Sequence, residues 1–228
     1  KIKNIIIGEL REINKKYKTP RRTAIIYEDQ VEQYDEEDQI EDYPVHIFLT
    51  REGYFKKITP QSLRMSGEQK LKEEDSIVQT VEATNNTELL FFTDRCQVYK
   101  TRASEFADTK ASVLGDFVAA KLGFDEGESA VAMIVTTDYK GCLLFFFENG
   151  KLAKVPLDSY ATKTNRKRLA NAYSEKSPLC RVYHIQEDQE FLLTSSSGRM
   201  LLVHTGAVAE KATRNTQGVA VMTQRKGH

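Results

Sequence analysis

The amino-acid sequence predicts an all-β, propeller-like protein of about four four-stranded blades, preceded by a short N-terminal helix. Three observations predict it: one hairpin pattern occurs four times, short strands recur between the hairpins in the same order, and helical spacing is confined to the start of the chain. In LLFFTDRCQVYKT, residues 89–101, an apolar run stops at a polar turn and resumes as alternating residues, which is typical of two antiparallel strands. A period near ~45 residues with about four strands per unit indicates a radial array of blades.

The first expected element is an amphipathic helix over residues 1 to about 16. Ile2, Ile6, Leu10 and Ile13 recur at spacings near three and four, with charged residues between them. Pro20 is expected to end this helix. No capping residue precedes it, so we expect it to be the last part of a longer helix.

An acidic stretch follows, because residues 28–42 carry nine acids and no base. Such a segment is too polar to pack, and it is predicted to be an irregular or partly extended linker.

Four hairpins are predicted, starting at Asp42, Asn86, Lys140 and Asp188. Their turns end at Gly53, Cys96, Gly150 and Gly198, which are 43, 54 and 48 residues apart. Glycine suits a turn position with positive φ because it has no Cβ to clash. Cys96 departs from this pattern, so the second hairpin is expected to contain strain or a different turn type.

Shorter strands are expected between the hairpins. In residues 73–83, 125–137 and 174–185 an acidic patch leads into such a strand, and small apolar strands are expected at residues 117–124 and 218–222. A plain β-sandwich remains the alternative, since all hairpins resemble one another in sequence.

Composition narrows the class of protein. No run approaches the roughly 20 apolar residues that span a bilayer, and the N-terminus lacks a secretory signal, so we expect a cytoplasmic protein with no membrane partner. Cys96, Cys142 and Cys180 are far apart, which argues against a disulfide framework or a zinc site. The formal net charge is zero, but residues 151–181 contain eight bases against Asp158 and Glu175.

The repeats resemble the C-terminal domain of the A subunit of bacterial type IIA topoisomerases, that is, DNA gyrase and topoisomerase IV. The resemblance is carried by LTREGYFKKI (49–58), by ELLFFTDRCQVYK (88–100), by RNTQGVAVM (214–222), and by ELREINKKYKTPRRTAI (9–25), which is similar to the end of the family's helical arm. It implies an arm end over residues 1–27, the acidic linker over 28–42 and a DNA-binding β-pinwheel over 43–228.

The resemblance also implies binding of double-stranded DNA along a basic rim, through phosphate contacts that need only projecting lysine and arginine side chains. The expected DNA-binding residues are Lys56, Lys57, Lys100, Arg102, Lys151, Lys154, Lys163, Arg166, Lys167, Arg168, Arg199, Lys211 and Arg214, of which the cluster in TNRKR (164–168) is the first choice. The implied partners are the A-subunit cleavage core and the ATPase B subunit of a bacterial, nucleoid-associated enzyme.

Two departures from the family pattern bear on this interpretation. Gyrase carries a basic, glycine-rich box after the first hairpin, whereas residues 62–75 here read SLRMSGEQKLKEED. The sequence therefore resembles topoisomerase IV or a divergent paralogue more than a supercoiling gyrase. Four repeats are visible where a full gyrase disc would have six, and an open arc exposes an edge.

Catalytic and metal sites are not indicated by the sequence. Tyr54, Tyr99 and Tyr160 occupy repeat positions and are interpreted as packing residues, while Ser195, Ser196 and Ser197 are interpreted as turn residues. The histidines, His46, His184, His204 and His228, show no paired metal-ligand spacing. No GxxxxGKS/T loop is present, so this chain is expected to bind no cofactor, and ATP and Mg²⁺ are expected on other parts of the complete enzyme. A protein-interaction propeller and a propeller enzyme with a central site remain the alternatives.

Overall fold

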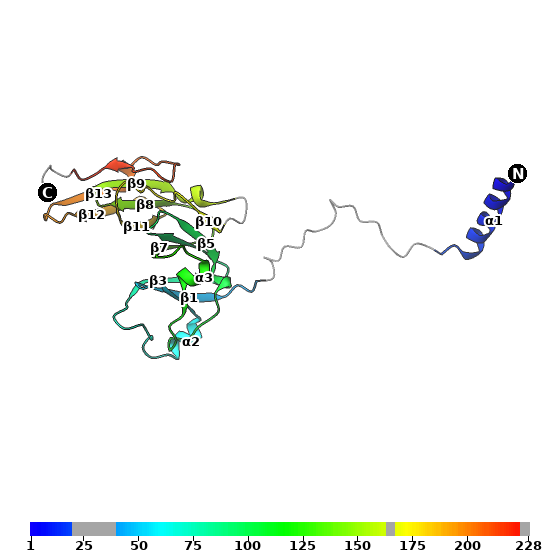
Figure 1. Ribbon diagram of the computed structural model, residues 1–228, viewed down its shortest axis with the longest axis horizontal. Helices are drawn as coiled ribbons and strands as arrows, with labels where there is room; N and C mark the ends of the chain where they lie inside the picture. The colour runs from blue at the N-terminus through cyan, green and yellow to red at the C-terminus, as the bar shows by residue number, and fades with distance from the viewer. Residues whose placement is uncertain (20–39, 163–166, 224–228) are drawn as a thin grey trace. The chain divides into compact units, whose positions relative to one another are not determined.

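The computed structural model describes residues 1–19, 40–162 and 167–223 (Figure 1). Internal contacts divide the chain into two units, Lys1–Gln39 and Ile40–His228. In the first unit, α1 (Ile2–Tyr17) confirms the predicted helix, and the N–H of Lys18 closes it by donating to the Asn14 carbonyl at 2.8 Å. Pro20 and residues 28–39 of the predicted linker lie outside the described residues.

The second unit confirms the all-β, propeller-like class. Its first sheet has the order β3 (Ile77–Thr84), β1 (Pro44–Thr50), β2 (Tyr54–Ile58), β6 (Asp116–Phe117). The second has the order β7 (Ala130–Thr136), β4 (Glu88–Thr93), β5 (Val98–Arg102), β10 (Arg168–Leu169), and the third β11 (Leu179–Ile185), β8 (Cys142–Phe147), β9 (Lys151–Pro156), β14 (Val219–Ala220). The fourth sheet, β12 (Glu190–Thr194) and β13 (Met200–His204), has two strands among the described residues instead of the four that were predicted.

The chain passes from sheet to sheet in a repeated way. The last strand of each of the first three sheets is β6, β10 or β14, and in the sequence it follows the hairpin of the next sheet. The chain therefore returns after each hairpin to complete the preceding sheet: β6 pairs with β2, β10 with β5, and β14 with β9. At the other edge of the sheets, β7 contacts both β3 and β11, so these three are the inner strands. The opposite edges, formed by β6, β10 and β14, are therefore the outer edges of the three sheets.

The strand predicted over residues 117–124 is wrong in most of its length. Only Asp116–Phe117 pair as β6, and Val118–Leu122 form α3, which ends at Gly123 with φ 67°. The sequence Ala-Ala-Lys-Leu favours a helix, and a glycine in the left-handed region is a common helix end.

A helical turn follows each hairpin. It is α2 (Pro60–Arg64) after the first, and the 3₁₀ turns η3 (Ala103–Glu105), η4 (Leu157–Tyr160) and η5 (Thr205–Ala207) after the others. Pro60 suits the first position of α2, where no backbone donor is needed, and the Thr59 hydroxyl caps the helix. Leu63 of α2 packs with Phe48 and Ile58 over the face of the first sheet that points away from the second.

Apolar side chains fill the spaces between successive sheets. Phe55 lies 4.2 Å from Phe106 between the first and second sheets, centroid to centroid, and Phe92 lies 5.6 Å from Phe145 between the second and third. The second and third sheets are therefore covered on both faces. Among the described residues, no helix is long and apolar enough to cross a membrane.

All four predicted turn positions adopt the left-handed conformation. Their φ values are 83° at Gly53, 55° at Cys96, 73° at Gly150 and 80° at Gly198. The strain expected at Cys96 is therefore present, since an L side chain in this region costs roughly 1–2 kcal/mol.

Candidate nucleic-acid interface

Three of the expected DNA-binding lysines occupy one structural position in the repeat. Lys57, Lys100 and Lys154 each lie four residues after the turn positions Gly53, Cys96 and Gly150. The side chain of each lysine lies on the face of its sheet against which the next hairpin packs. The segment that later returns to the outer edge of the sheet passes over the same face. This position therefore belongs to the contacts between blades.

Lys57 and Lys154 are buried and ion-paired. The Lys57 ammonium lies 3.1 Å from Asp108 and donates to the side-chain amide oxygen of Asn85 at 2.6 Å. The Lys154 ammonium lies 2.8 Å from Asp188 and 3.4 Å from Glu210. Burial by itself would lower the pKa of Lys154, but the two carboxylates raise it above its ordinary value.

Lys100 is half-buried, and its ammonium donates to the Thr162 hydroxyl at 3.2 Å and lies 4.9 Å from the ring centroid of Tyr139. Burial lowers its pKa, with Glu88 acting in the opposite direction.

Lys56 lies on the other face of β2 and is fully buried. Its ammonium donates to the carbonyl oxygens of Lys70, at 2.6 Å, and Ala111, at 3.4 Å, and burial lowers its pKa. With Lys57 and Lys154, it is therefore placed in the interior and not on an exposed basic rim. The physical reason is the position of these lysines on covered strand faces, where backbone carbonyls and carboxylates replace water around the ammonium groups.

The two described residues of the first-choice cluster, Lys167 and Arg168, lie at the outer edge of the second sheet, where Arg168 begins β10. Lys163 and Arg166 lie outside the described residues. The Lys167 side chain is 72% exposed, and its ammonium lies 3.0 Å from Glu105. Arg168 forms a two-pronged ion pair with Asp125, which lowers the pKa of that carboxyl, and its guanidinium lies over the Tyr99 ring. Both described bases of the cluster are therefore matched by an acid.

The other expected bases divide by exposure. Lys211 and Arg199 are exposed, and Arg199 donates to the Thr223 carbonyl at 3.0 Å. Lys151 and Arg102 are half-buried, and the Lys151 ammonium donates to Gln217 at 2.9 Å.

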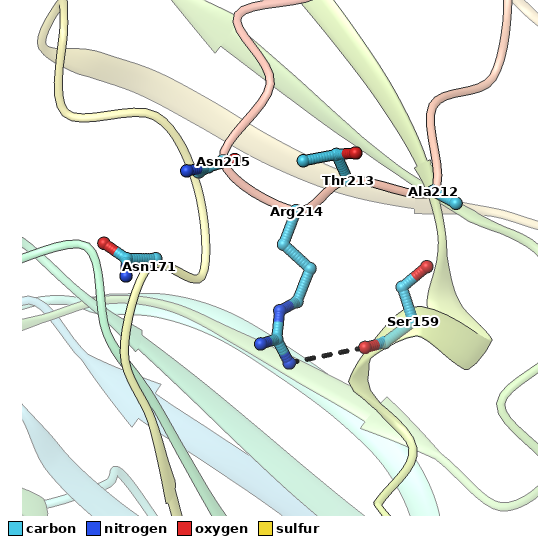
Figure 2. Close-up of a pocket in the computed structure, with 6 residues that line it drawn as sticks. All are labelled: Ser159, Asn171, Ala212, Thr213, Arg214 and Asn215. Atoms are coloured by element: carbon cyan, nitrogen blue, oxygen red, sulfur yellow. Dashed lines mark hydrogen bonds between the residues drawn. The ribbon is translucent and has the colours of Figure 1, made fainter.

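Arg214 lies in a pocket of about 450 Å³ where the segment leading to β14 meets residues on either side of β10. The pocket is lined by Ser159, Asn171, Ala212, Thr213, Arg214 and Asn215. Figure 2 shows the Arg214 side chain extending between Asn171 and Ser159, and it donates to the Ser159 carbonyl at 3.4 Å. The lining contains one cation, two carboxamides and two hydroxyls but no carboxylate, which is a chemistry suited to an anion.

Sequence reasoning selected Arg214 but missed its neighbours in the pocket and the acids that pair with Lys167 and Arg168. Ser159, Asn171 and Asn215 carry no charge, so only the meeting of two distant segments identifies them as neighbours of Arg214. Glu105 and Asp125 are 62 and 43 residues from their basic partners in the sequence.

Two of the three tyrosines that the sequence predicts to be packing residues lie in the core. Tyr99 and Tyr160 are buried, and burial together with the Glu128 carboxylate raises the pKa of Tyr99 to about 12. Over the ranges that the structure describes, no three His, Cys, Asp or Glu side chains are grouped to hold a metal ion.

Comparisons with known proteins agree with this architecture. The protein family described as "DNA gyrase C-terminal domain, beta-propeller" matches residues 87–137 and 189–228. The A subunit of DNA topoisomerase 4 from Staphylococcus aureus is 27% identical over 217 residues, a match that covers 92% of this chain and 27% of the relative. The chain thus spans about a quarter of the length of that relative.

Solved structures share the fold. The C-terminal domain of DNA topoisomerase IV superposes with a TM-score of 0.71 at 23% identity, covering 83% of this chain and 60% of that one. The DNA gyrase A C-terminal domain superposes with a TM-score of 0.55 at 17% identity, covering 81% of this chain and 62% of that one. The resemblance that the sequence indicates is confirmed: nearly the whole chain is similar to the A subunit of a bacterial topoisomerase IV, and its β unit has the fold of the C-terminal domains of topoisomerase IV and DNA gyrase.

Proposed function

We propose that this chain is an accessory DNA-binding module of a type IIA topoisomerase. It holds or bends one segment of double-stranded DNA and presents it to a cleavage core on another part of the same polypeptide. One observation carries this proposal: the outer-edge segments of the second and third sheets gather exposed and half-exposed bases. These segments are residues 157–171, which contain β10, and residues 205–220, which end in β14. Their described charged residues are Lys167, Arg168, Lys211 and Arg214 against Asp158 and Glu210.

The charge on the outer edges also suggests where the DNA lies. The outer segment of the first sheet, residues 103–117, carries Glu105, Asp108 and Asp116 against Lys110. Phosphates are attracted to the basic segments and repelled by the acidic one. DNA is therefore proposed to follow the second and third sheets and to avoid the first. The formal net charge of zero fits a modest affinity that depends on these local contacts.

We further propose a role closer to that of topoisomerase IV than to that of a supercoiling gyrase. The S. aureus relative belongs to DNA topoisomerase 4, and residues 62–75, where gyrase has its basic box, carry five acids or amides among their few bases. Part of this segment packs on the first sheet, where Lys56 binds the Lys70 carbonyl.

The wider assembly is proposed by analogy with these relatives. The module acts with the A-subunit cleavage core and an ATPase B subunit, in the cytoplasm and on the nucleoid. ATP and Mg²⁺ act on those other parts of the enzyme.

The test is a salt titration of binding to a fluorescent duplex of about 40 base pairs. Each lost phosphate contact lowers the slope of log K against log salt by about 1. Lys167→Gln and Lys211→Gln are each expected to weaken binding and to make this slope shallower.

Arg181→Gln is the matched control, because Arg181 is exposed but lies on the inner strand β11. It removes the same charge from the opposite edge of a sheet and should leave the slope unchanged. Absence of binding at low salt would overturn the DNA-binding function and favour the protein-interaction alternative. Equal effects of all three variants would overturn the outer-edge path.

A further inference from the structure

We propose that the pocket around Arg214 receives a single phosphate group of the DNA backbone and sets the position of the duplex between the second and third sheets. The inference rests on the proposed function and assigns it a specific contact. The pocket lies where the two basic outer-edge segments meet, so a backbone that follows both segments passes over it.

Arg214 is held in place for such a contact. Its guanidinium carbon lies 5.9 Å from the ring centroid of Tyr160, and Tyr160 is itself fully buried with its hydroxyl donating to the Ala172 carbonyl at 2.6 Å. The Ser159 carbonyl accepts one further, long hydrogen bond of 3.4 Å from the guanidinium. A side chain fixed between an aromatic ring and a carbonyl loses little conformational entropy when an anion binds.

Most of the hydrogen-bonding capacity of Arg214 remains available. A guanidinium has five N–H donors in a planar fork that matches two oxygens of a phosphate. One of these donors is engaged among the described residues, and the same part of the chain provides no carboxylate within ion-pair distance of Arg214. Lys167 and Arg168 differ in this respect, because Glu105 and Asp125 already pair with them.

The neutral lining of the pocket supplies further donors. Hydroxyl and carboxamide groups such as those of Thr213, Asn171 and Asn215 commonly bind phosphate oxygens. Asn171 has φ 54°, in the left-handed region that asparagine tolerates better than most residues. Figure 2 shows its side chain on the opposite side of Arg214 from Ser159, so the guanidinium has polar groups on both sides.

The experiment measures duplex binding against salt for Arg214→Gln, Arg214→Lys and Asn171→Gly. Arg214→Gln should weaken binding roughly three- to ten-fold near 0.1 M salt and lower the salt slope by about 1. Arg214→Lys should restore the slope but not the full affinity, since a lysine cannot make the two-pronged contact. Asn171→Gly keeps the backbone conformation and removes only the carboxamide, so it should weaken binding without changing the slope.

Arg181→Gln is again the matched control, because Arg181 also donates to a carbonyl oxygen, that of Cys180 at 3.2 Å, but lies on the inner strand β11. Wild-type melting behaviour of the variants, followed by circular dichroism, separates a lost contact from a lost fold. If the wild-type chain binds DNA and Arg214→Gln binds like Arg181→Gln, the phosphate pocket is overturned while the DNA-binding function stands. If the wild-type chain binds no DNA, both are overturned.

Discussion

At the scale of single residues, Lys57 and Lys154 tie a hairpin to a part of the chain that follows some fifty residues later. Each ammonium group bonds two polar partners in a largely covered site, which satisfies a charge that would otherwise be costly to bury. The fourth hairpin has Leu202 at the corresponding position, four residues after Gly198, and this leucine is exposed. A buried lysine therefore occupies this position in the first and third hairpins, where the face of the blade is covered, and not in the fourth, where it is exposed.

Replacing Lys154 by Met should destabilise the fold by about 1.5–3 kcal/mol, the value of hydrogen bonds to a charged group. It should also change the dependence of stability on pH. Lys154 and Thr205 hold the pKa of Asp188 below its ordinary 3.8, so this carboxylate stabilises the fold above that value and the contribution is lost as the pH falls through the lowered pKa. The raised pKa of Lys154 acts in the opposite range: its contribution is present below 10.5 and is lost as the pH rises above it.

The measurement is the free energy of unfolding in urea, from about pH 3 to about pH 7, for the wild type and the variant. The loss of stability toward low pH should be smaller in Lys154→Met. Lys211→Met, an exposed change of the same kind, should follow the wild-type curve. Identical pH curves for Lys154→Met and the wild type would show that the pair contributes nothing.

Gly218 lies where the segment leading into β14 approaches β9 closely. It has φ 69°, and a Cβ there would lie 1.9 Å from the Leu152 carbonyl oxygen, whereas a Cβ on Gly198, with φ 80°, would meet nothing within 4 Å. Gly198→Ala should therefore cost only the roughly 1–2 kcal/mol of the left-handed conformation. Gly218→Ala should cost at least about 3 kcal/mol, because β14 must also move away from β9. Thermal unfolding of the two variants tests this, and equal melting temperatures would contradict the close approach.

At the scale of elements, the outer-edge segments combine bases with acids from neighbouring elements. Glu105 of η3 pairs with Lys167, and Asp125, in the loop between α3 and β7, pairs with Arg168. Exposed ion pairs of this kind contribute little to stability, typically about 0–1 kcal/mol. Their larger effect is on binding, because a DNA phosphate must compete with an internal carboxylate for the same cation.

Glu105→Gln is therefore expected to tighten DNA binding by roughly two- to five-fold near 0.1 M salt and to steepen its salt dependence. Stability should change by less than about 1 kcal/mol. Fluorescence anisotropy with a short duplex measures the binding change. Glu190→Gln, which removes the same charge from β12, serves as the control, and a tighter complex in that variant as well would attribute the effect to net charge alone.

In the β unit as a whole, the sheets follow one another so that each packs against the sheet before it and the sheet after it. The first sheet is covered by α2 on one face, and the second and third by sheets on both faces. The fourth exposes Leu192, Met200 and Leu202 at 60%, 65% and 59%. Stability in such arrays is approximately a sum of contributions from units and from contacts between neighbours.

Native-state hydrogen exchange should reflect this arrangement. The amides of β4 and β8 should exchange slowest, since they lie in sheets covered on both faces, and those of β12 and β13 fastest. Exchange followed by mass spectrometry resolves these strands. Protection of β12 equal to that of β8 would show instead that the unit opens as one cooperative body.

The hairpins, their turns and the resemblance to topoisomerase C-terminal domains could be predicted from the sequence alone, because alternating apolar residues and turn glycines act over a few neighbouring residues. Even the strain at Cys96 could be predicted from the departure of one turn residue from glycine. Only the tertiary structure decided which bases face solvent. Lys57 and Lys167 look equally basic in sequence, yet one is buried beside Asp108 and the other is 72% exposed. The return of each outer strand to the preceding sheet and the meeting of Arg214 with Asn171 also arise from packing between distant segments, and residue order does not record such contacts.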